Sequence, residues 1–175
     1  MRIFTAVEIP DEAKLSIYNL IKNINTEANV KWVDKDNFHI TLKFFGEVKT
    51  LSTLENALKE ACNDFEPFNV SLSGLGAFPS KSRVKVLWIG LDKGENELKD
   101  IYKNIEDKAV DLGFKKEERN YTPHITIGRI KKGILEFPEI EFSYPSFLAA
   151  KITLFESILK PSGPIYRIIN RFPED

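Results

Sequence analysis

The sequence carries two tripeptides with the same residues in the same order, His39-Ile40-Thr41 and His124-Ile125-Thr126, and they include both of its histidines. In each tripeptide a histidine stands two residues before a threonine, within a run that alternates in polarity. Side chains two residues apart share one face of a β-strand, so each strand would present an imidazole beside a hydroxyl. The ordinary pKa of histidine lies near neutrality. Two histidines facing each other across a cleft would provide a general acid and a general base.

Phosphodiester cleavage is the chemistry that this combination suits best. One neutral imidazole would activate water or a hydroxyl, while the other, protonated, would donate its proton to the departing oxygen. The hydroxyls of Thr41 and Thr126 would donate hydrogen bonds to the phosphate oxygens as negative charge develops. A zinc site fits less well, because zinc needs three or four ligands and neither tripeptide has a carboxylate or thiolate close by. We therefore expect no metal and no cofactor, and a metal-dependent hydrolase is the alternative that a chelator would reveal.

The bulk composition predicts one soluble domain spanning residues 1–175. The chain is 42% hydrophobic and 29% charged, with a formal net charge of −1, which argues against a protein that grips long nucleic acid. The single cysteine, Cys62, excludes an internal disulfide. The first ten residues include Arg2 and Glu8 and lack the apolar core of a signal peptide, and no 18-residue apolar run occurs. A cytoplasmic protein that does not enter a membrane is expected.

The spacing of apolar residues predicts strands and helices in an irregular order. The predicted strands cover residues 2–9, 38–45, 68–75, 84–90, 124–130, 148–159 and 165–172. The predicted helices begin at Asp11, at a capping box formed by Ser52 and Glu55, and at about residue 96, the last running to residue 112. This order favours an α+β sandwich over a doubly wound parallel sheet. Each half offers a helix, a His-x-Thr strand and then a basic residue, which indicates two similar lobes around a central groove.

Strict alternation within residues 38–45 places Lys43 and Phe45 on the face of His39, and Phe44 on the opposite face. On that face Phe45 would stack on an unpaired base of a nucleic acid, or would close a hydrophobic rim. Lys43 would attract phosphate, or would simply be solvated. The sequence thus predicts Phe45 and Lys43 as substrate-binding candidates.

Several short segments, in order along nearly the whole chain, match the motifs of a known family. They are Trp32-Val33, Asn37, His39, Thr41-Leu42, Phe44, Gly46, Val48, Gly74, Gly76, Phe78-Pro79, Trp88-Ile89-Gly90, Pro123-His124-Ile125-Thr126-Ile127-Gly128-Arg129, Glu156-Ser157, Pro161, Gly163-Pro164 and Tyr166. The chain thereby resembles the two-histidine (2H) phosphoesterases, and among them the RNA 2′,3′-cyclic phosphodiesterases, also called LigT or ThpR and long known as 2′-5′ RNA ligases. A bare His-x-Thr is common, whereas this series of segments is specific.

The resemblance implies a bilobal α+β fold with both motifs in a central cleft, and metal-independent opening of a 2′,3′-cyclic phosphate to a 2′-phosphate. It implies that His39 protonates the leaving 3′ oxygen and that His124 activates water, with the roles exchanged in 2′-5′ ligation. It adds Arg129 as a phosphate-binding cation and Tyr166 as a residue that borders the cleft or packs beside it. Strict alternation places Arg129 opposite His124, so it reaches the site only if Gly128 introduces a bulge or the strand ends there.

The partner implied by the resemblance is an RNA 3′ end that bears a 2′,3′-cyclic phosphate, with tRNA halves as the natural candidates and a monomer as the expected state. Two alternatives stay open. The same scaffold could act on 2′-5′ oligoadenylates or on small cyclic nucleotides, which substrate panels would distinguish. A protein of another class would bind RNA ends with the same histidines and would show no turnover.

Overall fold

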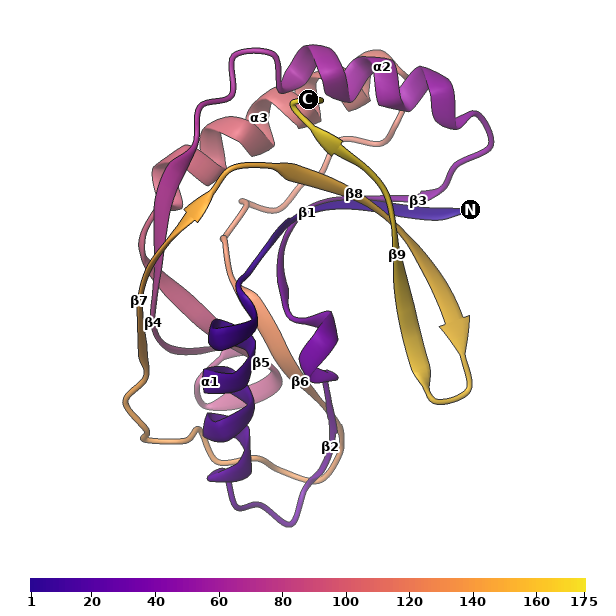
Figure 1. Ribbon diagram of the computed structural model, residues 1–175. Coiled ribbons are helices and arrows are strands. Elements are labelled where there is room, and N and C mark those ends of the chain that lie inside the picture. The colour runs from indigo at the N-terminus through magenta and orange to yellow at the C-terminus, as the bar shows by residue number, and fades with distance from the viewer.

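Nine strands form two antiparallel sheets in the computed structural model, which describes residues 1–175 (Figure 1). In spatial order, the first sheet contains β3 (His39–Glu47), β1 (Arg2–Glu8), β8 (Ile152–Lys160) and β9 (Gly163–Phe172). The second sheet contains β2 (Asn29–Trp32), β6 (Ile125–Lys132), β5 (Arg83–Lys93), β4 (Phe68–Ser80) and β7 (Ser143–Ala149). The helices are α1 (Asp11–Lys22), α2 (Leu51–Ala61) and α3 (Glu95–Asp111), and a short 3-10 turn, η1 (Lys35–Asn37), precedes β3.

The helices lie outside the sheets. Helices α2 and α3 run side by side along one end of the molecule, and the β8–β9 hairpin projects away from it (Figure 1). The first His-x-Thr motif lies on β3 of one sheet, and the second lies at the start of β6 in the other sheet. The predicted α+β arrangement of two sheets with outer helices is confirmed. None of the helices combines the length and the apolar character that crossing a bilayer requires.

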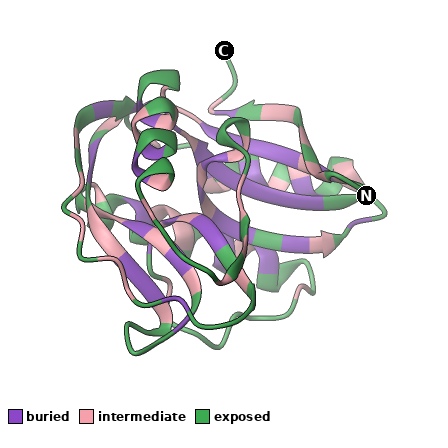
Figure 2. Cartoon of the chain, turned by 90° about the horizontal axis from the view of Figure 1, so that it is seen from below, coloured by how far each residue is buried: buried purple, intermediate pink, exposed green.

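Alternation along β1 supplies residues to two separate apolar clusters. Ile3 and Val7 belong to a core of 31 buried residues drawn from both sheets, which follows the inner strands in Figure 2. Phe4 and Ala6 point to the other face of the same sheet and form a smaller cluster with Phe155. The first sheet is therefore apolar on both faces, and the smaller cluster lies against the first histidine motif.

One strand was missed and two local predictions are wrong. Strand β2 was not predicted, because its four residues carry only a weak alternating pattern. The single strand predicted over residues 148–159 is two strands, β7 and β8, which pair in different sheets, so a continuous apolar run conceals the crossing from one sheet to the other. Helix α2 begins at Leu51 with Thr50 at its N-cap and has no side-chain capping bond, so the predicted capping box at Ser52 and Glu55 does not form.

Candidate active site

The two histidines are held by the same local hydrogen bond. Nδ1 of His39 lies 2.7 Å from the carbonyl oxygen of Asn37, and Nδ1 of His124 lies 2.6 Å from that of Thr122. A carbonyl oxygen can only accept, so Nδ1 carries the proton in both rings and donates it. Each neutral imidazole consequently presents the lone pair of Nε2, the form that a proton acceptor requires.

Aromatic rings surround His39 on the floor of the cleft. Its ring centroid lies 5.2 Å from that of Phe4 and 5.3 Å from that of Tyr166, which meets it edge-on at 79°. Burial among these rings, with a smaller contribution from the charges of Lys14 and His124, lowers the pKa of His39 to about 4, although the hydrogen bond to Asn37 opposes the change. His39 is therefore neutral at neutral pH.

The surroundings of His124 are similar. Its ring lies 5.1 Å from that of Phe78, edge-on at 86°, and 5.5 Å from that of Trp88. Burial lowers the pKa of His124, and the charge of Arg129 lowers it further, while the hydrogen bond to Thr122 opposes both effects. Both histidines thus rest in the neutral form and are placed to accept a proton.

Thr41 lies beside its histidine, as alternation along the strand predicts. The hydroxyl of Thr41 lies 2.8 Å from Nε2 of His39, and it donates to that nitrogen when Nδ1 carries the proton. Thr126 is half-buried and is paired across the strands with Trp88, whose ring contacts His124. Thr41 and His124 line one cavity, which brings the two motifs together from different sheets.

The strand that carries Arg129 has an irregularity next to Gly128, which is the condition that the sequence set for Arg129 to reach the site. The pairing of β5 with β6 is irregular: Leu87 pairs with Gly128, but Trp88 pairs with Thr126. The extra residue resets the alternation, as a β-bulge does. Arg129 pairs across the strands with Val86, which lines the cavity shared by Thr41 and His124, and its charge acts to lower the pKa values of His124 and Tyr166. Its role as a phosphate ligand stays a prediction.

The assignment of Phe45 to the cleft was wrong, whereas Lys43 lines the cavity that Thr41 and His124 share. The pairing of β1 with β3 shifts register twice, once between Ile3 and Phe4 and once between Thr5 and Ala6. These shifts turn Phe45 into the core, where only 8% of it is exposed and it packs edge-on against Phe114 at 5.2 Å. They turn its neighbour Phe44 outward, with 50% exposed.

Lys43 is not a free cation. Its ammonium lies 2.7 Å from a carboxylate oxygen of Glu106 on α3, and both side chains are 7% exposed. The other oxygen of Glu106 accepts the backbone N–H of Glu117 at 2.8 Å. Burial raises the pKa of Glu106, but the hydrogen bonds from Lys43 and Glu117 outweigh it and lower the pKa overall. Lys43 thus anchors the segment that leads to the second motif.

Tyr121 is a residue of the site that sequence reasoning missed. It is half-buried, and its hydroxyl donates to the backbone carbonyl of Thr41 at 2.8 Å. Its ring stacks on that of Tyr102 from α3, with centroids 4.4 Å apart and planes at 14°. Tyr121 therefore fixes the segment before His124 to the strand that carries His39. No local spacing signals a bond between residues 80 positions apart.

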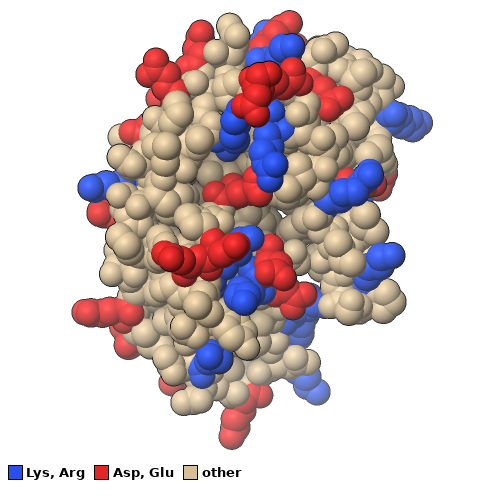
Figure 3. Space-filling view, viewed as in Figure 1, with Lys and Arg blue, Asp and Glu red and all other residues tan.

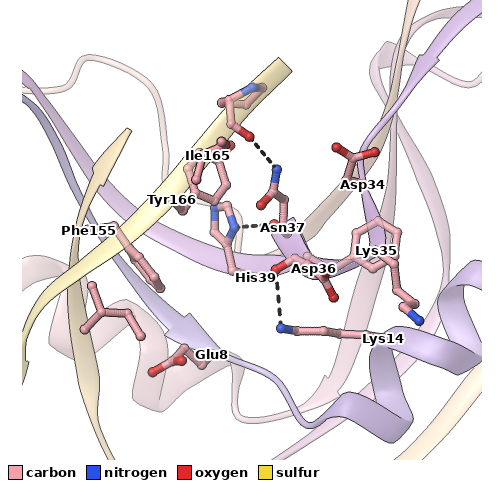
Figure 4. Close-up of a pocket in the computed structure, with 13 residues that line it drawn as sticks. Glu8, Lys14, Asp34, Lys35, Asp36, Asn37, His39, Phe155, Ile165 and Tyr166 are labelled. Atoms are coloured by element: carbon pink, nitrogen blue, oxygen red, sulfur yellow. Dashed lines mark hydrogen bonds between the residues drawn. The ribbon is translucent and has the colours of Figure 1, made fainter. Parts of the chain in front are cut away.

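Two cavities adjoin the histidines. The first, about 550 Å³, lies beside His39 and Tyr166 and includes Lys14 and Asp36 (Figure 4). There the side-chain amide of Asn37 donates to the carbonyl of Pro164 at 3.0 Å, which ties the start of β3 to the β8–β9 hairpin. The second cavity, about 920 Å³, is lined by both Thr41 and His124. On the face of the molecule in Figure 3, acidic and basic side chains are interspersed, without a broad field of one sign.

No group of three or more His, Cys, Asp or Glu side chains is arranged to hold a metal ion. The site offers instead two imidazoles, the hydroxyl of Thr41 beside one of them and an arginine at the edge. This set can accept and donate a proton at two points and can bind an anion between them.

Comparison with known proteins gives a consistent family. A family model described as "LigT like Phosphoesterase" matches residues 7–88 and 89–166. The RNA 2′,3′-cyclic phosphodiesterase of Methanocaldococcus jannaschii is 38% identical over 98% of this chain and 100% of its own. The protein of the same name from Archaeoglobus fulgidus is 36% identical over 98% of this chain and 99% of its own.

Solved structures share the fold over nearly the whole chain. A protein of Thermus thermophilus superposes with a TM-score of 0.87 at 23% identity and covers 98% of this chain and 97% of its own, a likeness in fold alone. Escherichia coli LigT in complex with 3′-AMP superposes with a TM-score of 0.81 at 25% identity, over 98% of this chain and 96% of its own.

Proposed function

The chain belongs to the LigT-like phosphoesterase family, and from this premise we propose that it hydrolyses 2′,3′-cyclic phosphate ends of RNA to 2′-phosphates. One observation carries the proposal. Two histidines from different sheets have the same Nδ1 hydrogen bond to a backbone carbonyl, which leaves Nε2 of each ring as the nitrogen that can accept a proton. Such a pair can take a proton from water on one side of a phosphate and give one to the leaving oxygen on the other.

In the proposed mechanism His124 accepts a proton from water as the water oxygen attacks phosphorus. The bond from phosphorus to the 3′ oxygen breaks, and protonated His39 gives its proton to that oxygen, which leaves a 2′-phosphate. Thr41, Thr126 and Arg129 donate to the non-bridging oxygens, where charge accumulates. Because an anion favours the charged form of a nearby histidine, the bound phosphodiester itself raises the pKa of His39 and loads the acid.

Ligation uses the same two groups, with a 5′ hydroxyl in place of water. One histidine takes the proton of the 5′ hydroxyl as its oxygen attacks phosphorus, the bond from phosphorus to the 3′ oxygen breaks, and the other histidine protonates that 3′ oxygen, which leaves a 2′-5′ phosphodiester. In the reverse direction, cleavage of the 2′-5′ linkage, the two histidines exchange roles. The similar presentation of the two ring nitrogens supports this 2′-5′ ligation as a second proposed activity. It needs no nucleotide triphosphate, because the cyclic phosphate is the activated group.

The natural partners belong to the same proposal. RNA 3′ ends with cyclic phosphates are the substrates, and tRNA halves in the cytoplasm are the proposed source. A monomer suffices, because residues 1–175 contain both histidines and one shared core, so we treat the chain as a single catalytic domain.

The experiment is turnover, in the presence of EDTA, of a short RNA that ends in a 2′,3′-cyclic phosphate. We expect the wild-type protein to produce a 2′-phosphate end, and expect His39→Ala and His124→Ala to lose at least a hundredfold in kcat, as removal of a general acid or base does. Binding without turnover would instead identify an RNA-end binding protein. Loss of turnover in EDTA would contradict the metal-free mechanism.

The assignment of acid and base has its own test. Replacing the leaving 3′ oxygen of the substrate by sulfur makes protonation of the leaving group unnecessary. We expect this substrate to restore turnover by His39→Ala and to leave His124→Ala inactive. Rescue of His124→Ala alone would exchange the two roles.

A further inference from the structure

The second cavity extends well beyond the two histidine motifs. Its lining also includes Phe44 of β3, Lys85 of β5 and Arg119 in the segment before the second motif. Its volume of about 920 Å³ is larger than a cyclic phosphate alone requires, and its lining includes Thr41 and His124. The part of this cavity away from the reacting phosphate is therefore available to another portion of the substrate.

Phe44 offers an aromatic surface within this cavity. The residue is 50% exposed, although its ring lies parallel to the buried ring of Phe4 with centroids 5.3 Å apart and planes at 6°. Phe4 in turn lies 5.2 Å from the ring of His39, so one ring separates Phe44 from the reacting group. The guanidinium of Arg2 lies 5.7 Å from the centre of the Phe44 ring. A rigidly backed, exposed ring beside a cation is the arrangement on which an unpaired nucleobase stacks.

The charges of the second cavity suit a polyanion. Lys85 and Arg119 make no ion pair in the structure, and Glu117 is the one carboxylate in the lining. The first cavity differs, because its lining contains three carboxylates, those of Glu8, Asp34 and Asp36, beside two lysines. A phosphodiester backbone is repelled by carboxylates and attracted by free cations. The charge distribution thus selects the second cavity for the path of an RNA strand.

We propose that the second cavity binds the nucleotides that precede the cyclic phosphate in single-stranded RNA, with a base stacked on Phe44 and backbone phosphates at Lys85 and Arg119. This inference rests on the proposed function and narrows its substrate class. The protein acts on oligonucleotides in preference to a single nucleoside 2′,3′-cyclic phosphate. The preference comes from aromatic stacking and free cations, neither of which reads a base sequence.

The test compares kcat/KM for a nucleoside 2′,3′-cyclic phosphate with kcat/KM for a tetranucleotide that ends in the same cyclic nucleotide. We expect the wild-type protein to prefer the tetranucleotide at least about tenfold, in line with one stacked base. Similar values for both substrates, within twofold, would overturn the inference and leave the proposed function intact. Absence of turnover with either substrate would overturn both.

Variants locate the preference in the cavity. Phe44→Leu is expected to lower the ratio of the two kcat/KM values about tenfold, since one stacking platform is lost. For the tetranucleotide, log kcat/KM falls as log salt concentration rises. The double variant Lys85→Gln, Arg119→Gln is expected to make this slope less steep by about 1.4, the value for two phosphate contacts on a single strand.

The matched control removes the same two charges from outside the cavity. Lys131 and Lys132 are exposed at the end of β6 and do not line either cavity. Lys131→Gln, Lys132→Gln is expected to keep the ratio and the salt slope of the wild-type protein. Equal losses in the control and in the cavity variant would mean that only overall charge matters, and would overturn the placement of the RNA strand.

Discussion

The buried imidazole of His39 should make the folded protein less stable in mild acid, and His39→Asn should remove that penalty. An asparagine amide can donate to the carbonyl of Asn37, as Nδ1 of the imidazole does at 2.7 Å, but it has no proton to gain. The substitution therefore keeps one hydrogen bond and deletes one titration. It also opens a small cavity among the surrounding rings, a cost that does not depend on pH.

The size of the effect follows from the pKa of His39, which burial lowers from 6.5 to about 4. Between these two pH values the unfolded chain binds a proton at His39 that the folded chain does not. The free energy of unfolding therefore falls as the pH drops through this window and rises as the pH increases. A pKa change of this size corresponds to about 3 kcal/mol, complete below pH 4 and absent above pH 7.

The measurement is urea unfolding at a series of pH values from 7.5 to 4, followed by tryptophan fluorescence. We expect the difference in unfolding free energy between wild type and His39→Asn to move by about 3 kcal/mol in favour of the variant as the pH falls. Ile168→Val, which alters a residue of the same cavity without a titrating group, should differ from wild type by a constant amount. A difference for His39→Asn that is equally constant would refute the reasoning, because it would mean that the folded cleft admits the protonated ring freely.

Three further predictions concern the same cleft. Inorganic phosphate should raise the pKa of His39 in an NMR titration, since a bound anion favours the charged ring; an unchanged pKa would contradict the proposed loading of the acid. Tyr121→Phe, which removes the donor to the carbonyl of Thr41, should lower kcat several-fold with KM within twofold and reduce the unfolding free energy by about 1 kcal/mol; a change in KM alone would indicate direct substrate contact. Gly76→Ala places a methyl carbon 2.2 Å from the ring of Trp88, so the indole must move off the second histidine; kcat should fall about tenfold, and an unchanged kcat would show that Trp88 does not position that ring.

Much of this site could be predicted from the sequence because its chemistry is local. A histidine two residues before a threonine on a strand is enough to place both side chains on one face, and the structure keeps that relation at His39 and Thr41. The repeated tripeptide also predicted that two strands from different parts of the chain would meet. In the structure the two motifs line one cavity, each from a strand of its own sheet.

The supporting residues could not be predicted, because they act across long separations in the sequence. The carboxylate of Glu106 pairs with Lys43 from a position 63 residues away. In the sequence alone, Glu106 is one charged residue among several on a helix, and Lys43 is a lysine on a strand. Only the packing of α3 against β3 buries both and makes a pair of them. From the sequence pattern alone, both side chains would be expected to be solvated.

The wrongly predicted strand faces share one physical cause, a break in the regular pairing of the strand. The same break brings additional side chains to the cleft. Strict alternation would bury Phe44 and would turn Arg129 away from its histidine. An irregularity in the pairing of β3 turns Phe44 outward, and one in the pairing of β6 brings the charge of Arg129 to His124. Each motif strand thus keeps its His-x-Thr pair in regular alternation and then breaks register within a few residues. A regular strand could offer the cleft only every second residue; the break adds an aromatic ring on one side and a cation on the other.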